Sequence, residues 1–244
     1  TGNDFLDGNE GSDTMFGGDG NDRMLGGAPG FGPEIDTMYG GSGNDVMSGG
    51  NGNDSLYGET GDDILYGEYD NDYVSGGLGA DVLFGGQGLD TLLGEAGDDR
   101  LYGEGEDDNL SGGDGADTLD GGTGADILTG GFGNDIFYVD NANDQVFEQF
   151  DYDGGTDTVM SSITTTLAAN VENLQLLATA GASDGTGNAL NNRMQGNEAA
   201  NTLRGGDGHD QVFGMGGNDI LDGGPGLNYL AGGQGDDLYL VAGS

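Results

Sequence analysis

A nine-residue period runs through most of this chain and constrains its fold more than any other feature. It is clearest over residues 112–138, which read GGDGADTLD, GGTGADILT and GGFGNDIFY. When each unit is numbered from 1 to 9, glycine occupies positions 1, 2 and 4, aspartate position 6, and an apolar residue position 8. One unit repeated in this way predicts a stack of similar structural repeats.

The repeat begins within the first residues and continues to Tyr138, broken by one insertion at residues 28–35. Position 8 is Leu, Met, Val or Phe in every unit of this first block. Position 6 is aspartate in every unit, at Asp4, Asp13, Asp22, Asp36, Asp45, Asp54, Asp63, Asp72, Asp81, Asp90, Asp99, Asp108, Asp117, Asp126 and Asp135.

The chain is predicted to have three parts. Residues 1–138 form the first repeat block, residues 139–186 a linker or cap without the repeat, and residues 187–241 a second, looser block. The middle part is rich in Val, Thr and Leu, whose alternation predicts short strands. Both ends fall close to a repeat, so we expect the chain to be a piece of a longer protein. Position 6 of the second block reads Asn192, Asn201, Asp210, Asp219, Asn228 and Asp237.

The unit divides into a turn and a short strand. Glycines at positions 1, 2 and 4 permit positive φ and a tight turn. Positions 7–9 form the strand, in which position 8 points to one face and its neighbours to the other. Because one strand buries nothing alone, two units form one coil, and successive coils pair their strands about 4.8 Å apart. We therefore predict an all-β fold with a thin core between two parallel sheets.

The charge of the chain indicates what completes this fold. It has 45 Asp and Glu against four Lys and Arg, a net charge of -41, and only 33% hydrophobic residues. Such a composition is typical of disorder, but here the aspartates are periodic and keep step with the apolar residues. A hard divalent cation would neutralise them. Ca²⁺ accepts six to eight carboxylate and carbonyl oxygens, whereas Zn²⁺ prefers Cys and His, and the chain has no Cys and one His.

The units GGDGADTLD, GGSGNDVMS and GGLGADVLF resemble the nonapeptide GGxGxDxUx of RTX (repeats-in-toxin) calcium-binding proteins. The resemblance covers roughly three quarters of the chain and implies a parallel β-roll (a β-solenoid) with several Ca²⁺ ions in its turns. It also implies that units n and n+2 share each ion, so that Asp99 pairs with Asp117, Asp108 with Asp126, and Asp117 with Asp135.

The resemblance further implies backbone carbonyl ligands from positions 1, 2, 3 and 5 of the turns. Candidates are Gly40, Gly41, Ser42, Asn44, Gly49, Gly50, Asn51, Asn53, Gly76, Gly77, Leu78, Ala80, Gly112, Gly113, Asp114, Ala116, Gly121, Gly122, Thr123 and Ala125. The insertion at 28–35 puts the ions on either side of Asp36 in doubt. In the second block only Asp219 and Asp237 give two carboxylates, so turns with Asn192, Asn201 or Asn228 are expected to bind weakly or not at all.

Other functions are disfavoured by the composition. Binding of nucleic acid needs clustered Lys and Arg, and no apolar run approaches the roughly 20 residues of a membrane span. The absence of Cys excludes a disulfide framework. We expect no catalytic activity, because the one histidine, His209, lies inside a predicted calcium turn and periodic aspartates saturated by Ca²⁺ are poor general acids.

Two features allow more than one interpretation. Asp140, Asp144, Glu148 and Asp157 follow the first block and either complete a terminal ion site or are ordinary solvated acids. The aromatic residues at outward positions 7 and 9 either form a binding surface or stack on each other across strands, which we favour.

The resemblance implies a calcium-dependent module of a secreted, Gram-negative bacterial protein that is exported by type I secretion and folds outside the cell. The segment 154–178 also resembles linkers in the repeat modules of alginate epimerases. Alternatives are an accessory module of an extracellular enzyme (alginate epimerase, lipase or protease) and a spacer in an adhesin or surface layer. Extracellular polysaccharide and self-association are possible partners.

Overall fold

The computed structural model describes residues 1–27, 34–149 and 155–240. Within these ranges the chain forms short β-strands and one 3-10 turn, Ala178–Ala180, which confirms the all-β prediction. None of the helical structure in the described ranges is long or apolar enough to cross a membrane. The chain divides into two compact units: unit 1 contains Thr1–Asp135 and Asn143–Gln145, and unit 2 contains Ile136–Ala142 and Val146–Ser244.

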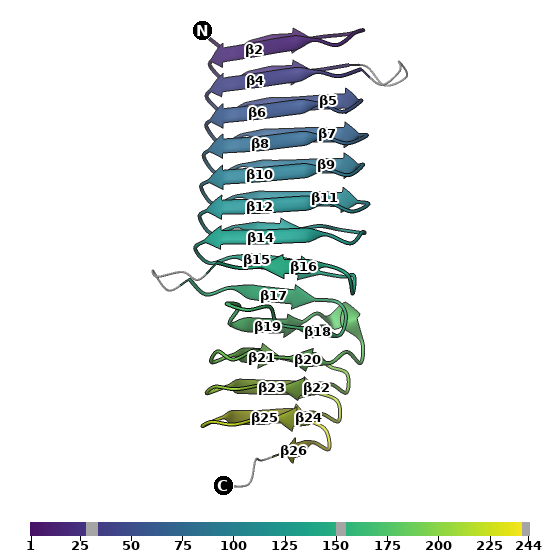
Figure 1. Cartoon of the computed structure of the whole chain (residues 1–244), viewed down its shortest axis with the longest axis vertical. Coiled ribbons are helices and arrows are strands. Elements are labelled where there is room, and N and C mark those ends of the chain that lie inside the picture. Colours follow the sequence, from purple (N-terminus) through teal and green to yellow (C-terminus); the bar gives the residue numbers. More distant parts are fainter. Residues whose placement is uncertain (28–33, 150–154, 241–244) are drawn as a thin grey trace. The chain divides into compact units, whose positions relative to one another are not determined.

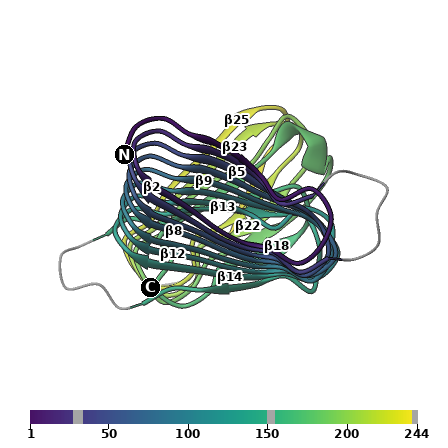
Figure 2. The same ribbon diagram turned by 90° about the horizontal axis from the view of Figure 1, so that it is seen from above.

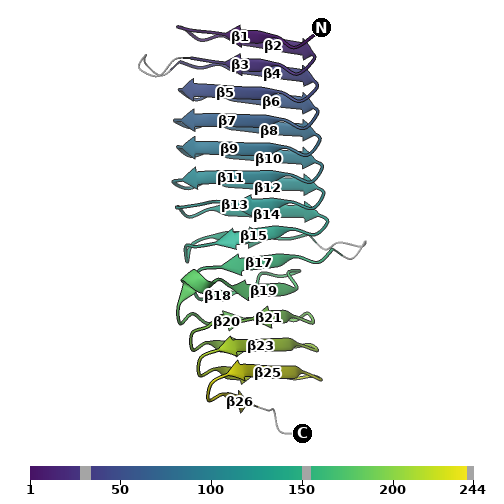
Figure 3. The same ribbon diagram turned by 180° about the vertical axis from the view of Figure 1, so that it is seen from behind.

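Unit 1 is a parallel β-roll in which the chain alternates between two sheets (Figures 1 and 3). The even-numbered strands form one sheet: β2 (Thr14–Asp19), β4 (Thr37–Ser42), β6 (Ser55–Thr60), β8 (Tyr73–Leu78), β10 (Thr91–Ala96), β12 (Asn109–Asp114) and β14 (Ile127–Phe132). The odd-numbered strands form the other: β1 (Phe5–Asp7), β3 (Arg23–Leu25), β5 (Val46–Asn51), β7 (Ile64–Tyr69), β9 (Val82–Gln87), β11 (Arg100–Gly105) and β13 (Thr118–Asp120).

Most strands are longer than the three residues expected from the repeat. β10, for example, runs from position 7 of one unit to position 3 of the next. Positions 2 and 3 take part in the ladder, since Glu95 pairs with Gly77 and Gly113 on the two neighbouring strands. The glycine pair therefore belongs to the end of the strand, and the turn proper is confined to positions 4 to 6.

The strands pair in a register that repeats every 18 residues. Leu92 lies between Val74 on β8 and Leu110 on β12. The coils consequently follow one another in the same outline, each slightly offset from the last, when unit 1 is seen from above (Figure 2). From Met24 to Leu128 the position-8 side chains have 0% exposure, so they form the predicted core between the sheets, one side chain per strand.

The insertion leaves this register intact. Most of it, residues 28–33, lies outside the described residues. After it, Thr37 and Met38 pair with Thr14 and Met15, and the N–H of Thr37 donates to the carbonyl of Asp13 (2.9 Å). The five extra residues therefore do not displace the strands that follow.

Unit 2 also consists of parallel sheets, but its first coils have irregular lengths. Its strands between residues 139 and 186 confirm the short strands expected there. One set comprises β15 (Ile136–Val139), β17 (Thr158–Ser161), β19 (Asn173–Leu176), β21 (Arg193–Gln195), β23 (Gln211–Gly216) and β25 (Tyr229–Gln234). The other comprises β18 (Thr165–Thr166), β20 (Gly185–Thr186), β22 (Thr202–Arg204), β24 (Ile220–Asp222) and β26 (Leu238–Leu240), and β16 (Gln145–Phe147) begins in unit 1.

Candidate metal centres

The position-6 aspartates form two ladders, one along each edge of unit 1. In each rung the backbone N–H of one aspartate donates to Oδ1 of the aspartate one coil later, which is 18 residues on, or 23 where the insertion intervenes. Asp81 donates to Asp99 (2.8 Å), and Asp99 donates to Asp117 (2.8 Å). Each carboxylate is thus held in place by the preceding coil, and the n to n+2 pairing expected from the resemblance is the pairing that brings these residues together.

The second oxygen of these carboxylates has no such partner. Oδ2 is buried and accepts no hydrogen bond from any described residue in most of the turns. This holds for Asp13, Asp22, Asp36, Asp45, Asp54, Asp63, Asp72, Asp81, Asp90, Asp99, Asp108, Asp117, Asp210 and Asp219. Buried polar atoms are nearly always satisfied, so a row of unsatisfied acceptors indicates ligands for a cation.

The pKa values of the same groups show that the protein alone does not stabilise their charge. Burial raises the pKa of Asp99 to about 7; the hydrogen bond from Asp81 lowers it, and the nearby carboxylates of Asp117 and Asp81 raise it further. Burial likewise raises the pKa of Asp72 and Asp108 to about 8. Desolvation without a counter-charge disfavours the ionised form, and a bound cation would supply that charge.

In several turns a carbonyl oxygen from the next coil lies near the same point as Oδ2. A Cβ atom at Gly94 would lie 2.6 Å from the carbonyl oxygen of Gly112, and closer still to Asp99 Oδ2. Glycine at position 1 therefore leaves room for a carboxylate and a carbonyl from neighbouring coils to converge. The donor set consists of carboxylate and carbonyl oxygens, which fits Ca²⁺ and does not fit metals that need nitrogen or sulfur.

The ladder passes through two places where the sequence left doubt. Asp13 donates to Asp36 Oδ1 and Asp36 donates to Asp54 Oδ1, both at 2.8 Å, so the insertion does not remove Asp36 from its row. At the other end, the N–H of Asp126 donates to Asp144 Oδ1 (3.1 Å). Asp144 therefore occupies position 6 of one further unit, whereas Asp157 donates instead to Glu172 Oε2 (2.9 Å).

In the second block the aspartates keep the same geometry. The N–H of Asp219 donates to Asp237 Oδ1 (3.0 Å), and the N–H of Asp210 donates to the amide oxygen of Asn228 (2.8 Å). Burial raises the pKa of both Asp210 and Asp219. These coils therefore retain candidate carboxylate ligands, although only one pair has two carboxylates.

Position 5 has a structural role that the sequence analysis missed. Where this residue is Asn or Asp, its side chain accepts the N–H of position 5 one coil later, as when Asp98 Oδ1 accepts the N–H of Ala116 (2.9 Å). His209 fits the same row, because its N–H donates to Asn191 Oδ1 (2.8 Å) and its Nδ1 accepts the N–H of Leu227 (2.9 Å). The frequent Asn and Asp at this position are the signal that could have revealed the row.

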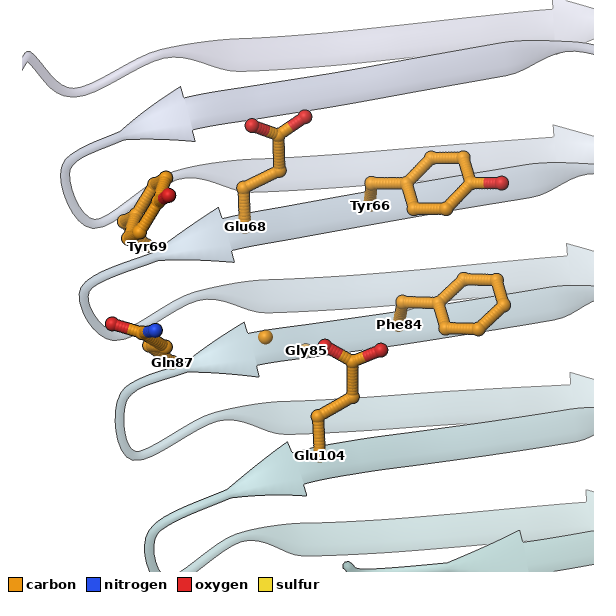
Figure 4. Close-up of a pocket in the computed structure, with 8 residues that line it drawn as sticks. Tyr66, Glu68, Tyr69, Phe84, Gly85, Gln87 and Glu104 are labelled. Carbon is orange, nitrogen blue, oxygen red and sulfur yellow. The ribbon is translucent and has the colours of Figure 1, made fainter. Parts of the chain in front are cut away.

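The outward aromatic residues stack on each other, which confirms the favoured interpretation. Tyr66, Phe84 and Tyr102 form one row, with ring centroids 4.9 and 5.1 Å apart. Figure 4 shows the first two rings side by side, with Glu68 and Glu104 projecting from the rungs on either side of Gly85. These residues line a hollow of about 250 Å³. Stacking between adjacent rungs stabilises the sheet.

A substitution in one turn tests how tightly the coils are packed. We expect Gly115→Ala to destabilise the calcium-bound roll by about 3 kcal/mol or more. Gly115 has φ of +147°, and an added Cβ would collide with the carbonyl of Gly97. Gly105→Ala is the matched control, because its nearest neighbour would be 3.7 Å away and its φ is not positive. Thermal unfolding in calcium measures both, and equal melting temperatures for the two variants would contradict the described turn.

Comparison with known protein families agrees with this geometry. A family model described as RTX calcium-binding nonapeptide repeat (four copies) matches residues 1–28, 32–65, 48–83, 75–110, 84–119, 111–146, 186–221 and 210–239. The matches cover both repeat blocks and extend to residue 146, which includes the unit that contains Asp144. No curated protein matches the chain.

Proposed function

The chain belongs to the family of RTX calcium-binding nonapeptide repeats, and on that premise we propose that the position-6 aspartates of successive coils bind Ca²⁺ in pairs and that these ions stabilise the roll. Units n and n+2 share each ion. The aspartates supply Oδ2, and the glycine-rich turns supply backbone carbonyls, including those of Gly112, Gly113 and Asp114.

The observation that carries this proposal is the row of buried Oδ2 atoms without a hydrogen-bond donor among the described residues. Leaving one buried acceptor unsatisfied costs about 1–3 kcal/mol, and more when it is charged. A row of such charged atoms beside backbone carbonyls is stabilised when a cation binds between them. Ca²⁺ meets that need at several turns at once.

Native mass spectrometry and titration calorimetry test the proposal directly. We expect several Ca²⁺ ions per chain, and fewer for Asp99→Asn, because Asp99 contributes to the ions shared with Asp81 and with Asp117. The matched control is Asp98→Asn, since Asp98 is exposed and an amide oxygen can still accept the N–H of Ala116. A chain that binds no Ca²⁺, or two variants with the same ion count, would refute it.

We further propose that the chain is secreted and folds only after export. In a compartment poor in calcium, a net charge of -41 would keep the repeats extended, which suits passage through a type I secretion channel of a Gram-negative bacterium. Millimolar calcium outside would then neutralise the turns. Support comes from the charge and from the family; the test is whether export and extracellular folding separate when calcium is withheld.

The chain is proposed to act as a binding and folding module and not as an enzyme. Its family consists of calcium-binding repeats, and its periodic carboxylates are better suited to hold ions than to transfer protons. As a module it could serve an extracellular enzyme such as an alginate epimerase, lipase or protease, or act as a spacer in an adhesin or surface layer. Calcium-dependent self-association would favour the second role.

A further inference from the structure

Two consecutive nonapeptides in unit 2 have asparagine in place of the usual glycine and aspartate. They read GNALNNRMQ (187–195) and GNEAANTLR (196–204), with asparagine at positions 2 and 6. All four side chains lie among the described residues, and three of them, Asn192, Asn197 and Asn201, are buried. In the structure these amide groups hydrogen-bond to backbone groups of their own turn and of the preceding coil, and no ion is needed to satisfy them.

In the first of these turns, the amide groups cover carbonyls of the preceding coil. Asn192 Nδ2 donates to the carbonyls of Val171 (3.2 Å) and Glu172 (3.1 Å) and to Asn188 Oδ1 (3.1 Å). Asn188 Nδ2 donates to the carbonyls of Ala168 and Val171, both at 2.7 Å. The Asn192 oxygen accepts the N–H of Asn188 (2.8 Å), so both atoms of its amide group are used.

The second turn repeats the arrangement on the other edge. Asn197 Nδ2 donates to the carbonyls of Leu177 and Gly181, both at 2.9 Å, and Asn201 Nδ2 donates to the carbonyl of Ser183 (2.7 Å). The N–H of Asn197 donates to Asn201 Oδ1 (2.9 Å). The recurrence of one hydrogen-bond pattern in two turns indicates a built motif, G-N-x-x-x-N.

This motif reverses the chemistry of the aspartate turns. Where Asp99 presents a buried oxygen that has no donor among the described residues, Asn192 and Asn201 present an NH₂ group that donates to backbone carbonyls. The backbone differs as well: Asn188 and Asn197 at position 2 lack the positive φ found at the equivalent Gly113. The amide nitrogen thus supplies the positive dipole that an ion supplies elsewhere.

The surrounding segment also carries little charge. Residues 155–204 contain four acids (Asp157, Glu172, Asp184 and Glu198) and two arginines (Arg193 and Arg204), a net charge of 2 − 4 = −2. The rest of the chain therefore holds nearly all of the total charge of -41. Electrostatic repulsion, which keeps the other repeats apart without calcium, is weak here.

We propose that residues 155–204 fold without calcium and remain folded when the ion is removed. The inference rests on the calcium-dependent folding proposed above and identifies the part of the chain that is exempt from it. The segment has its own buried side chains, including Val159, Leu174, Met194 and Leu203. Its strands β21 and β22 pair with β23 and β24 of the next coil, where Asp210 and Asp219 again carry Oδ2 atoms that lack a donor among the described residues.

It follows that the amide-closed segment presents ready-made strand edges on which the calcium-dependent coils of unit 2 can add. Adding a new coil then costs only the conformational entropy of that coil, because the strands with which it pairs are already ordered. The segment therefore sets the register of residues 205–240 before any ion binds.

Hydrogen exchange of the full chain, with peptides resolved by mass spectrometry, tests this inference. In EGTA, peptides from 165–204 should exchange at least about tenfold more slowly than peptides from 46–114, as expected when hydrogen bonds persist. Asn192→Asp should abolish that difference, because it removes three donated hydrogen bonds and places a carboxylate against carbonyl oxygens. Asn191→Asp is the matched control, since Asn191 is exposed and only accepts the N–H of His209.

The outcomes separate the two proposals. Equal, fast exchange of both regions in EGTA would overturn the inference and leave calcium-dependent folding intact. Equal, slow exchange with and without calcium would overturn calcium-dependent folding, and the inference would then be decided by Asn192→Asp. If that variant protects 165–204 as well as Asn191→Asp does, the amide-closed turn is not what holds the segment.

Discussion

Transfer from millimolar calcium into EGTA should remove most of the β-sheet signal of unit 1 in far-ultraviolet circular dichroism, and calcium should restore it. The coils of unit 1 have a core of one side chain per strand, such as Leu92 and Leu101, and a row of buried carboxylates on each edge. Without a cation these carboxylates repel each other in a desolvated site. When free Ca²⁺ is present at 100 times the dissociation constant of a site, its binding adds about 2.7 kcal/mol to the free energy of unfolding. Several such ions bind to one stack of coils.

Magnesium at the same concentration is the control for this experiment. Mg²⁺ demands a small octahedral site and loses water reluctantly, so it should restore much less signal than Ca²⁺ does. An identical spectrum in EGTA and in calcium would mean that the core and the strand ladders suffice, and the role given to the ions would have to be abandoned.

Acid should partly replace calcium as a folding agent. In EGTA, unit 1 should gain β-structure as the pH is lowered from about 8 towards 5. Burial raises the pKa of Asp54 and Asp63 to about 7 and that of Asp108 to about 8, above the ordinary pKa of 3.8 that these groups have in the unfolded chain. The folded state binds more protons than the unfolded state in this interval, so stability falls as the pH rises through 6 to 8 and is fully present only below about 4.

The same groups should give calcium binding the opposite dependence on pH. Protons and Ca²⁺ compete for the position-6 carboxylates, so calcium affinity should weaken as the pH falls from 8 to 6. Circular dichroism in EGTA and calcium titrations at each pH measure the two effects on one sample. If the chain in EGTA is no more folded at pH 5 than at pH 8, the buried carboxylates are not what prevents folding without calcium.

The repeat made the inward and outward positions of the fold predictable. Because position 8 is apolar in every repeat from Leu56 to Leu128, its side chain must face the core in each coil. Alternation along a strand then places positions 7 and 9 on the outside. The spacing of 18 residues between coils followed because a single strand with one inward side chain cannot form a core. These features depend on local periodicity, which a sequence displays directly.

The different roles of the two carboxylate oxygens, with Oδ1 accepting a hydrogen bond and Oδ2 left for a cation, could not be predicted in the same way. They depend on which backbone N–H of the preceding coil faces Oδ1, as Asp81 faces Asp99, and this is set by the twist and offset of the coils. The insertion before Asp36 was expected to disturb its row, because sequence spacing does not show that Asp36 still faces Asp13 and Asp54. The role of Asn188 was not predicted, because the carbonyls of Ala168 and Val171 to which it donates lie about 20 residues away in an irregular coil.

The 18-residue register has a consequence for how such a chain can change its length. Removing two adjacent units takes out one complete coil and leaves the remaining pairs in line, so that Tyr66 would still meet an aromatic ring of its own row. Removing a single unit would carry every later strand to the opposite sheet and bring the aromatic row of Phe16, Tyr39 and Tyr57 against that of Phe84 and Tyr102. Duplication and loss should therefore proceed in pairs of units, which makes the coil, and not the nonapeptide, the module that evolution can add.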